Sequence, residues 1–288
     1  MARLLHLAAA VAVLVVASGC SSSGSGSDQA TEYDSYVALG DSYTAAPGVP
    51  PTDATSSFCQ RSGRNYPALL AAALPRAAVT DVSCSGAGTG SMTAPEVVGT
   101  ASVPAQFDAL TADTDLVTVG LGANDGGLFG GVVNGCVQLA ASDPVGSPCQ
   151  NFWAARTPGI DDLLSGITFN LAGVLDGIRQ RSPHARVVVV GYPQLVPASG
   201  TCAELPLAAA DYPFVRDVTQ RLSEALRTAA EQADADYVDV WKASEGHDIC
   251  ADEPWVNGAT ENPDTAIAFH PLAVEQQAVA ELVLDQVG

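Results

Sequence analysis

Short apolar segments alternate along the chain with longer stretches in which apolar residues recur at helical spacing. The pattern predicts strands over 35–39, 79–83, 116–120, 186–191 and 237–240. The fourth segment contains Val187-Val188-Val189-Val190, a β-branched run typical of a parallel strand buried on both faces. Helices are expected over 66–74, 161–181, 214–233 and 272–287. This alternation of strand and helix indicates a parallel sheet sandwiched between helices.

The N-terminal segment departs from this pattern. Arg3 is followed by an apolar run over 4–16, too short to span a bilayer, and then by small residues ending at Cys20. We interpret 1–19 as a bacterial lipoprotein signal, 20–32 as a lipidated cysteine with a Ser/Gly-rich tether, and 33–288 as one folded domain. The alternative is an ordinary signal peptide with an incidental cysteine. The protein is therefore expected to be exported, either held at the outer face of the cell membrane by its lipid alone or secreted.

Export changes the interpretation of the seven cysteines. With Cys20 assigned to lipidation, an even number remains, which in an oxidising compartment predicts three disulfides. Six cysteines allow 15 pairings, so the residues alone leave the pairing open. No CxxC pair or Cys/His cluster points to a metal site. The remaining cysteines are Cys59, Cys84, Cys136, Cys149, Cys202 and Cys250, and several fall in or beside Gly- and Pro-rich stretches that we interpret as long loops, at 43–65, 86–112, 125–158 and 192–212.

Charge excludes one class of partner. The chain has 288 residues, of which 47% are hydrophobic, enough to bury the core of one sizeable domain. Lys and Arg total 12 against 32 Asp and Glu, a formal net charge of −20. This field repels phosphate backbones and anionic membranes, so nucleic-acid binding is not expected.

Ser42 is the candidate nucleophile. It follows the first expected strand in the turn Gly40-Asp41-Ser42. Ligands of open α/β sheets bind outside the carboxyl ends of the strands, so a serine here can expose its Oγ and offer its N–H to an oxyanion. The alternative is that Asp41 or Ser42 only caps a following helix. A serine hydroxyl needs a positioned base, so the hypothesis requires a partner.

The four histidines differ in their place relative to the strands. His6 lies in the signal segment, and His184 precedes the fourth strand, at the opposite edge of the sheet from the nucleophile. His247 follows the fifth strand and His270 precedes the last helix, both on the nucleophile's edge. The proline after His270 gives it a rigid placement at a helix start. We therefore favour His270 as the base and keep His247 as the alternative.

Two further segments at this edge carry hydrogen-bond donors for an oxyanion. Asn124 follows the third strand and offers its side-chain amide between glycines. Gly86 follows the second strand and offers a backbone N–H in a loop rich in small residues. An ordinary turn at Asn124 and a loop bend at Gly86 are the structural alternatives.

Together these motifs resemble the SGNH (GDSL-type) hydrolase family, in the family's order and spacing from about residue 35 to the end of the chain. The segments around Cys59, Cys84 and Cys250, with Trp255-Val256-Asn257-Gly258, are similar to the secreted, disulfide-rich branch of that family. The matching blocks are Gly40-Asp41-Ser42-Tyr43, Ser85-Gly86, Gly122-Ala123-Asn124-Asp125 and His270-Pro271.

The resemblance implies a fold and a set of disulfides. The expected fold is an α/β three-layer sandwich, helices on both sides of a five-stranded parallel sheet. Neighbouring cysteines pair in this branch, which here implies Cys59–Cys84, Cys136–Cys149 and Cys202–Cys250.

One departure from the family concerns the group that orients His270. The usual final block places an aspartate three residues before the histidine, where this chain has Ile267. Some members of the branch use a backbone carbonyl instead. We therefore expect a Ser42–His270 dyad in which the Ile267 carbonyl accepts from the imidazole Nδ1–H. The alternative is that Asp264 completes a triad. A milder departure is Glu275-Gln276, where the branch often has Gly-His.

The resemblance implies a serine ester hydrolase, an esterase or lipase that cleaves carboxylic ester substrates through an acyl-enzyme. Ser42 and Gly86 N–H groups and the Asn124 amide would form the oxyanion hole. No metal or organic cofactor is required, and a monomer is expected. Alternatives are an acetyl esterase or acyltransferase on cell-envelope carbohydrate, or a tethered binding protein with an inactive hydrolase fold.

Overall fold

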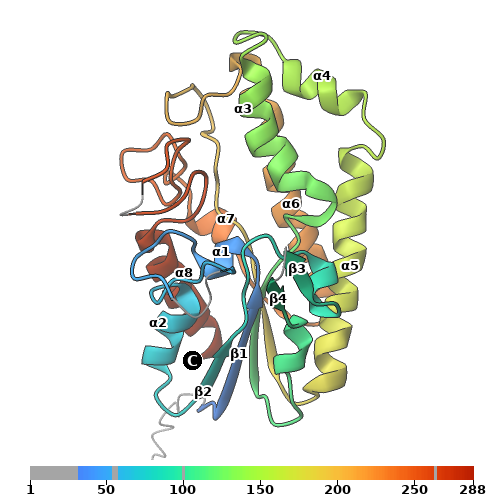
Figure 1. Cartoon of the computed structure of the whole chain (residues 1–288), viewed down its shortest axis with the longest axis vertical. Helices are drawn as coiled ribbons and strands as arrows, with labels where there is room; N and C mark the ends of the chain where they lie inside the picture. The colour runs from blue at the N-terminus through green and yellow to red at the C-terminus, as the bar shows by residue number, and fades with distance from the viewer. Residues whose placement is uncertain (1–31, 54–57, 99–100, 263–264) are drawn as a thin grey trace, which may run out of the picture. The chain divides into compact units, whose positions relative to one another are not determined.

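Five parallel strands form one sheet in the order β2-β1-β5-β6-β7 (Figure 1). The computed structural model describes residues 32–53, 58–98, 101–262 and 265–288. The strands are β1 (Ser35–Gly40), β2 (Ala78–Asp81), β5 (Leu116–Gly120), β6 (Arg186–Val190) and β7 (Asp236–Val238). The predicted sheet is confirmed. β7 ends earlier than expected because Val240 begins the short helix α7 (Val240–Ala243), which Asp239 caps.

Helices cover both faces of the sheet, so the three-layer α/β/α sandwich is confirmed (Figure 1). Successive side chains of a strand point to opposite faces, and β1 divides its apolar residues accordingly. Val37 and Leu39 belong to the core under one pair of helices, and Tyr36 and Ala38 to the core under the other. The first pair is α5 (Ile160–Arg181) and α6 (Tyr212–Gln232), and the second is α2 (Tyr66–Ala73) and α8 (Ala273–Val287).

Several short elements occupy stretches that the sequence assigned to loops. They are α1 (Ser42–Ala45), the 3-10 turns η2 (Thr89–Met92), η3 (Gln106–Ala109), η4 (Asp125–Gly127) and η6 (Ala209–Asp211), the hairpin of β3 (Glu96–Val98) and β4 (Ala101–Val103), a π-helical turn (Gly130–Asn134), α3 (Gly135–Ala140) and α4 (Pro148–Ala154). Disulfides fasten several of these connections. The predicted pairing is confirmed, with Cys59–Cys84, Cys136–Cys149 and Cys202–Cys250.

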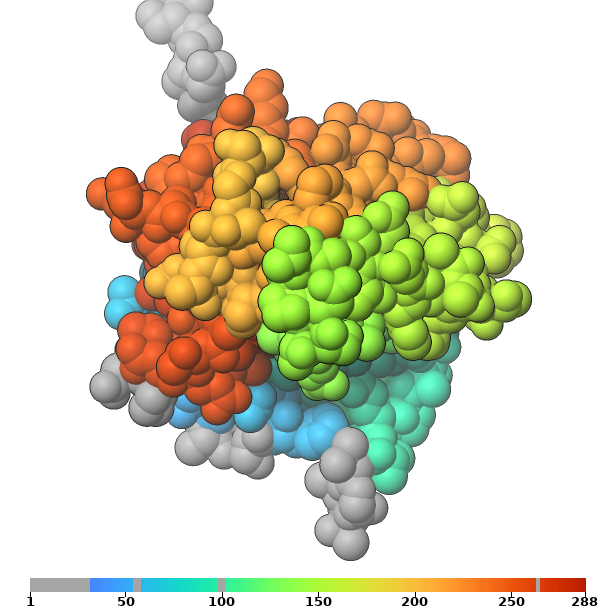
Figure 2. Space-filling model, turned by 90° about the horizontal axis from the view of Figure 1, so that it is seen from above, coloured from blue at the N-terminus to red at the C-terminus, as the bar shows by residue number. Residues whose placement is uncertain are grey.

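The carboxyl ends of the strands carry most of the irregular chain. Figure 2 looks onto this face, where the segments after β1 (blue), β5 (green), β6 (gold) and β7 (orange to red) gather. In the part of the chain that the structure describes, no helix is long and apolar enough to cross a membrane. The expected lipidation site Cys20, the signal segment and most of the tether lie outside the described residues.

Candidate active site

Ser42 and His270 meet at the carboxyl edge of the sheet. Ser42 is the first residue of α1, and its Oγ lies 3.0 Å from His270 Nε2. His270 Nδ1 lies 2.7 Å from the carbonyl oxygen of Ala268. A carbonyl oxygen can only accept, so Nδ1 carries the hydrogen and Nε2 is free to accept from the Ser42 hydroxyl. The two residues that the sequence paired are thus in contact, in the tautomer that a general base requires.

The prediction that the Ile267 carbonyl orients the imidazole is wrong. That oxygen accepts from the backbone N–H of His270 at 3.3 Å and from the side-chain amide of Asn257 at 3.2 Å. Phe269 has a left-handed backbone, with φ of +59°, and this turn brings the Ala268 carbonyl to the ring instead. Asp264, the alternative third member, lies outside the described residues.

The other histidines contact different groups. His247 Nδ1 lies 2.7 Å from the Glu253 carbonyl, and its ring stacks on Trp255 with the centroids 4.9 Å apart. His184 precedes β6, at the far edge of the sheet from Ser42, as the order of elements predicted. Of the two histidines kept as candidates, His270 is the one that the fold brings to the nucleophile.

Backbone pairing fixes the segment that carries His270. The Asn257 N–H donates to the His270 carbonyl at 2.9 Å, and the Phe269 N–H donates to the Gly258 carbonyl at 3.2 Å. The Asn257 side chain also donates to the Ala266 carbonyl at 2.9 Å. Sequence reasoning noted Asn257 only as part of a family signature; its hydrogen bonds give it a structural role in placing the base.

The surroundings of His270 keep its imidazole neutral. Burial lowers its pKa, and the hydrogen bond to Ala268 opposes this shift. The rings of Tyr43 and Phe129 lie 5.7 Å and 5.8 Å from the imidazole, centroid to centroid. A neutral ring at pH 7 is able to accept the serine proton.

The turn that presents Ser42 requires glycine at position 40. A Cβ at Gly40 would lie 2.1 Å from Thr44 Oγ1 and 2.9 Å from the Gly120 carbonyl, so any side chain would displace α1. Asp41 caps this short helix by accepting from the Tyr43 N–H at 2.8 Å. Burial raises the pKa of Asp41 to about 7, and its hydrogen bonds oppose the shift. The capping alternative therefore applies to Asp41, whereas Ser42 faces His270.

The two predicted oxyanion segments lie beside this turn. The Cys84 N–H donates to the Gly40 carbonyl at 3.0 Å, which brings the Gly86 loop alongside. Gly86 has φ of +89°, a conformation that favours glycine. The Asn124 amide donates to the Ala87 carbonyl at 3.0 Å, which joins the two loops. Among the described residues, the Ser42 and Gly86 N–H groups have no protein acceptor, so both are available to a ligand.

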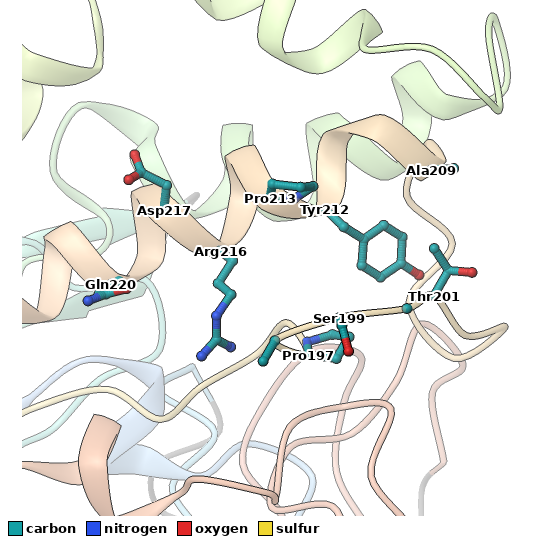
Figure 3. Close-up of a pocket in the computed structure, with 11 residues that line it drawn as sticks. Pro197, Ser199, Thr201, Ala209, Tyr212, Pro213, Arg216, Asp217 and Gln220 are labelled. Carbon is teal, nitrogen blue, oxygen red and sulfur yellow. The ribbon is translucent and has the colours of Figure 1, made fainter.

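One cavity lies away from these residues. It has a volume of about 470 Å³ and separates the 197–201 segment from the first half of α6 (Figure 3). Arg216 points across it, but its guanidinium already donates to Gln194 Oε1 at 3.0 Å and to the Val196 carbonyl. No predicted site residue lines it.

Within the described ranges, no cluster of three or more His, Cys, Asp or Glu side chains is arranged to bind a metal ion.

Comparison with known proteins shows the family of this chain. The model of the GDSL-like lipase/acylhydrolase family matches residues 38–274. A Streptomyces coelicolor protein described as Lipase 2 is 38% identical, over 90% of this chain and 88% of its own length. The crystal structure of phospholipase A1 from Streptomyces albidoflavus superposes with a TM-score of 0.72 at 28% identity, covering 89% of this chain and 100% of that one. The extracellular lipase of Streptomyces rimosus gives the same TM-score and identity, covering 88% and 99%. The chain belongs to the GDSL-like lipase/acylhydrolase family.

Proposed function

We propose that this protein hydrolyses carboxylic esters by transferring the acyl group to Ser42, with His270 as the general base. The observation that carries the proposal is the 3.0 Å contact between Ser42 Oγ and an imidazole nitrogen that can only accept. His270 takes the hydroxyl proton as Ser42 Oγ attacks the ester carbonyl. It then gives that proton to the leaving alkoxide, which departs as the alcohol, and activates a water molecule that releases the acid.

The oxyanion of each tetrahedral intermediate is stabilised by three donors. These are the Ser42 and Gly86 N–H groups and the Asn124 side-chain amide. The free N–H groups and the orientation of Asn124 toward the Gly86 loop support this assignment. Donors already in place stabilise the charge without reorganising during the reaction.

The base works in a dyad with Ser42. The Ala268 carbonyl holds the imidazole tautomer, but a neutral oxygen stabilises the imidazolium less than a carboxylate does. Asp264→Asn is therefore expected to be far milder than His270→Ala in steady-state kinetics. Equal losses of kcat in the two variants would favour Asp264 as the third member of a catalytic triad.

The substrate is an ester of a lipid. The relatives described as lipases and as a phospholipase A1 support this class. The test is a series of nitrophenyl esters of increasing acyl length, together with a phospholipid and an acetylated glycan. Turnover of long-chain and phospholipid esters is expected to depend on Ser42. Activity confined to acetyl esters of the glycan would contradict the lipid assignment and favour an acetyl esterase of the cell envelope.

The enzyme acts outside the cell, anchored through Cys20. Three disulfides and the small residues before Cys20 support export. A single lipid chain gives weak binding, so stable anchoring requires the several chains that a lipoprotein cysteine carries. Cys20→Ala should move the protein from the membrane fraction to the medium, and an unchanged distribution would contradict the anchor.

A further inference from the structure

The Tyr192 hydroxyl connects the nucleophile turn to the oxyanion loop. Tyr192 follows β6, and the residue is 6% exposed. Its hydroxyl donates to Asp41 Oδ2 at 2.6 Å and accepts from the Ala123 N–H at 3.1 Å. The other Asp41 oxygen accepts from the Tyr43 N–H. A continuous chain of hydrogen bonds therefore links the residue before Asn124 to the residue after Ser42, and the donors on both sides point toward the Asp41 carboxyl group.

We propose that Tyr192 is a positioning residue that fixes the Asn124 amide relative to Ser42 and so sets the geometry of the oxyanion hole. The inference rests on the ester hydrolysis proposed above. The Tyr192 hydroxyl is hydrogen-bonded to Asp41 and Ala123, and it acts on the site through these two residues.

The oxyanion loop needs such an anchor. Asn124 lies between Gly122 and Gly126, whose φ values of +128° and +61° place both in the region that favours glycine. Glycine restricts the backbone least, so hydrogen bonds must fix the loop. The Ala87 carbonyl orients the tip of the Asn124 side chain, and Tyr192 holds the backbone one residue earlier.

Tyr192→Phe removes this connection and little else. The ring packs edge-on against Tyr43 at 5.3 Å between centroids, and phenylalanine keeps that contact. The Asp41 carboxylate loses a donor and the Ala123 N–H loses its acceptor, both in a buried site. The loop can then shift relative to Ser42. Because the oxyanion forms only during the reaction, weaker stabilisation of the oxyanion should lower kcat and leave KM nearly unchanged.

The experiment compares Tyr192→Phe with Tyr36→Phe on a nitrophenyl ester. Tyr36 is also buried, and its replacement removes a 2.8 Å hydrogen bond to Thr118 on the opposite face of the sheet. We expect kcat to fall about 10- to 100-fold in Tyr192→Phe with KM nearly unchanged, since small misplacements have effects of this size. In Tyr36→Phe, kcat should stay within about twofold while the melting temperature falls.

A double-mutant cycle with Asn124→Ala separates positioning from a general structural role. Once the Asn124 amide is gone, Tyr192→Phe should have a much smaller effect on kcat. The proposal would be overturned if Tyr192→Phe lowered kcat by the same factor in the wild type and in Asn124→Ala. An unchanged kcat in Tyr192→Phe would also overturn it. If Tyr192→Phe does not fold, Asp41→Asn enters the same cycle, because the amide cannot accept from both Tyr43 and Tyr192. The same outcomes then apply.

Failure of this proposal is distinguishable from failure of the proposed function. Turnover that survives Ser42→Ala would refute ester hydrolysis at this site. Turnover that requires Ser42 but is indifferent to Tyr192 would refute the positioning role alone.

Discussion

The Ala268 carbonyl fixes the tautomer of His270, and this uncharged partner affects how the activity depends on pH. A neutral carbonyl fixes the ring but adds no negative charge to stabilise the imidazolium. Burial lowers the pKa of His270, and no carboxylate among its described partners counteracts that effect. Protonated His270, which cannot accept the serine proton, is therefore confined to acidic solution.

The acid limb of kcat/KM should reflect this lowered pKa. Since free histidine titrates near 6.5, we expect the activity of the free enzyme to fall only below about pH 6.5. Measurement of kcat/KM for a neutral ester across the acidic range gives the apparent pKa. An acid limb above that value would mean that a carboxylate raises the pKa of His270, as a triad would.

The choice of Ala268 over Ile267 could not be read from the sequence. Spacing predicted that His270 lies at the edge of the sheet where Ser42 lies, because it stands just before a helix. Which carbonyl faces the ring depends on the left-handed φ of Phe269, a bulky residue that rarely adopts it. Tyr192 was missed for a related reason: its partner Asp41 lies 151 positions away.

At the scale of elements, the strands and long helices were predictable because their apolar periodicity is set by burial against the sheet. The two helices of the α3–α4 segment were not predictable from the sequence. They have only 6 and 7 residues, too short to show a period, and Gly and Pro residues surround them. The Cys136–Cys149 disulfide ties these two helices together, and the Cys59–Cys84 disulfide fastens the loop that carries Gly86.

The two disulfides should differ in their effect on activity. Cys84 lies two residues before Gly86, and the Ser85 N–H donates to the Cys59 carbonyl at 3.1 Å. Replacing both cysteines by serine should lower kcat about 10-fold or more, because Gly86 is then less well placed, and should destabilise the protein by roughly 2–5 kcal/mol.

The Cys136→Ser/Cys149→Ser pair is the matched control. It removes a disulfide of α3–α4, so we expect a comparable loss of stability with kcat largely retained. Urea unfolding and ester kinetics on both variants give the comparison. A larger loss of kcat in the α3–α4 variant would contradict the role assigned to the Cys59–Cys84 bridge.

At the scale of the whole molecule, buried carboxyl groups make the fold less stable as the pH rises from the acidic range to about 8. Glu275 lies in the first turn of α8 and is 2% exposed, and its carboxyl group accepts from the Gln276 side-chain amide at 2.6 Å. Burial raises its pKa from 4.5 to about 8. The folded protein therefore retains a proton that the unfolded chain has already released, and the resulting stabilisation is lost as pH rises from about 4.5 to about 8. Asp41 acts in the same direction.

Glu275→Gln should flatten this dependence. The amide is neutral at every pH and can still accept from Gln276. The free energy of unfolding of the variant should therefore fall less than that of the wild type between about pH 5 and pH 8. Glu281→Gln, on the exposed face of the same helix, is the control and should follow the wild type. Parallel curves for all three proteins would contradict the buried, protonated state of Glu275.

The identity of the nucleophile is decided by covalent labelling. The intact mass of the protein is measured after treatment with a fluorophosphonate, followed by peptide mapping. Because Ser42 has a neutral base at 3.0 Å, one phosphonyl group should attach to Ser42, turnover should stop, and Ser42→Ala should remain unlabelled although it folds. An unlabelled wild type, or a label at another residue with activity retained in Ser42→Ala, would contradict acyl transfer through Ser42.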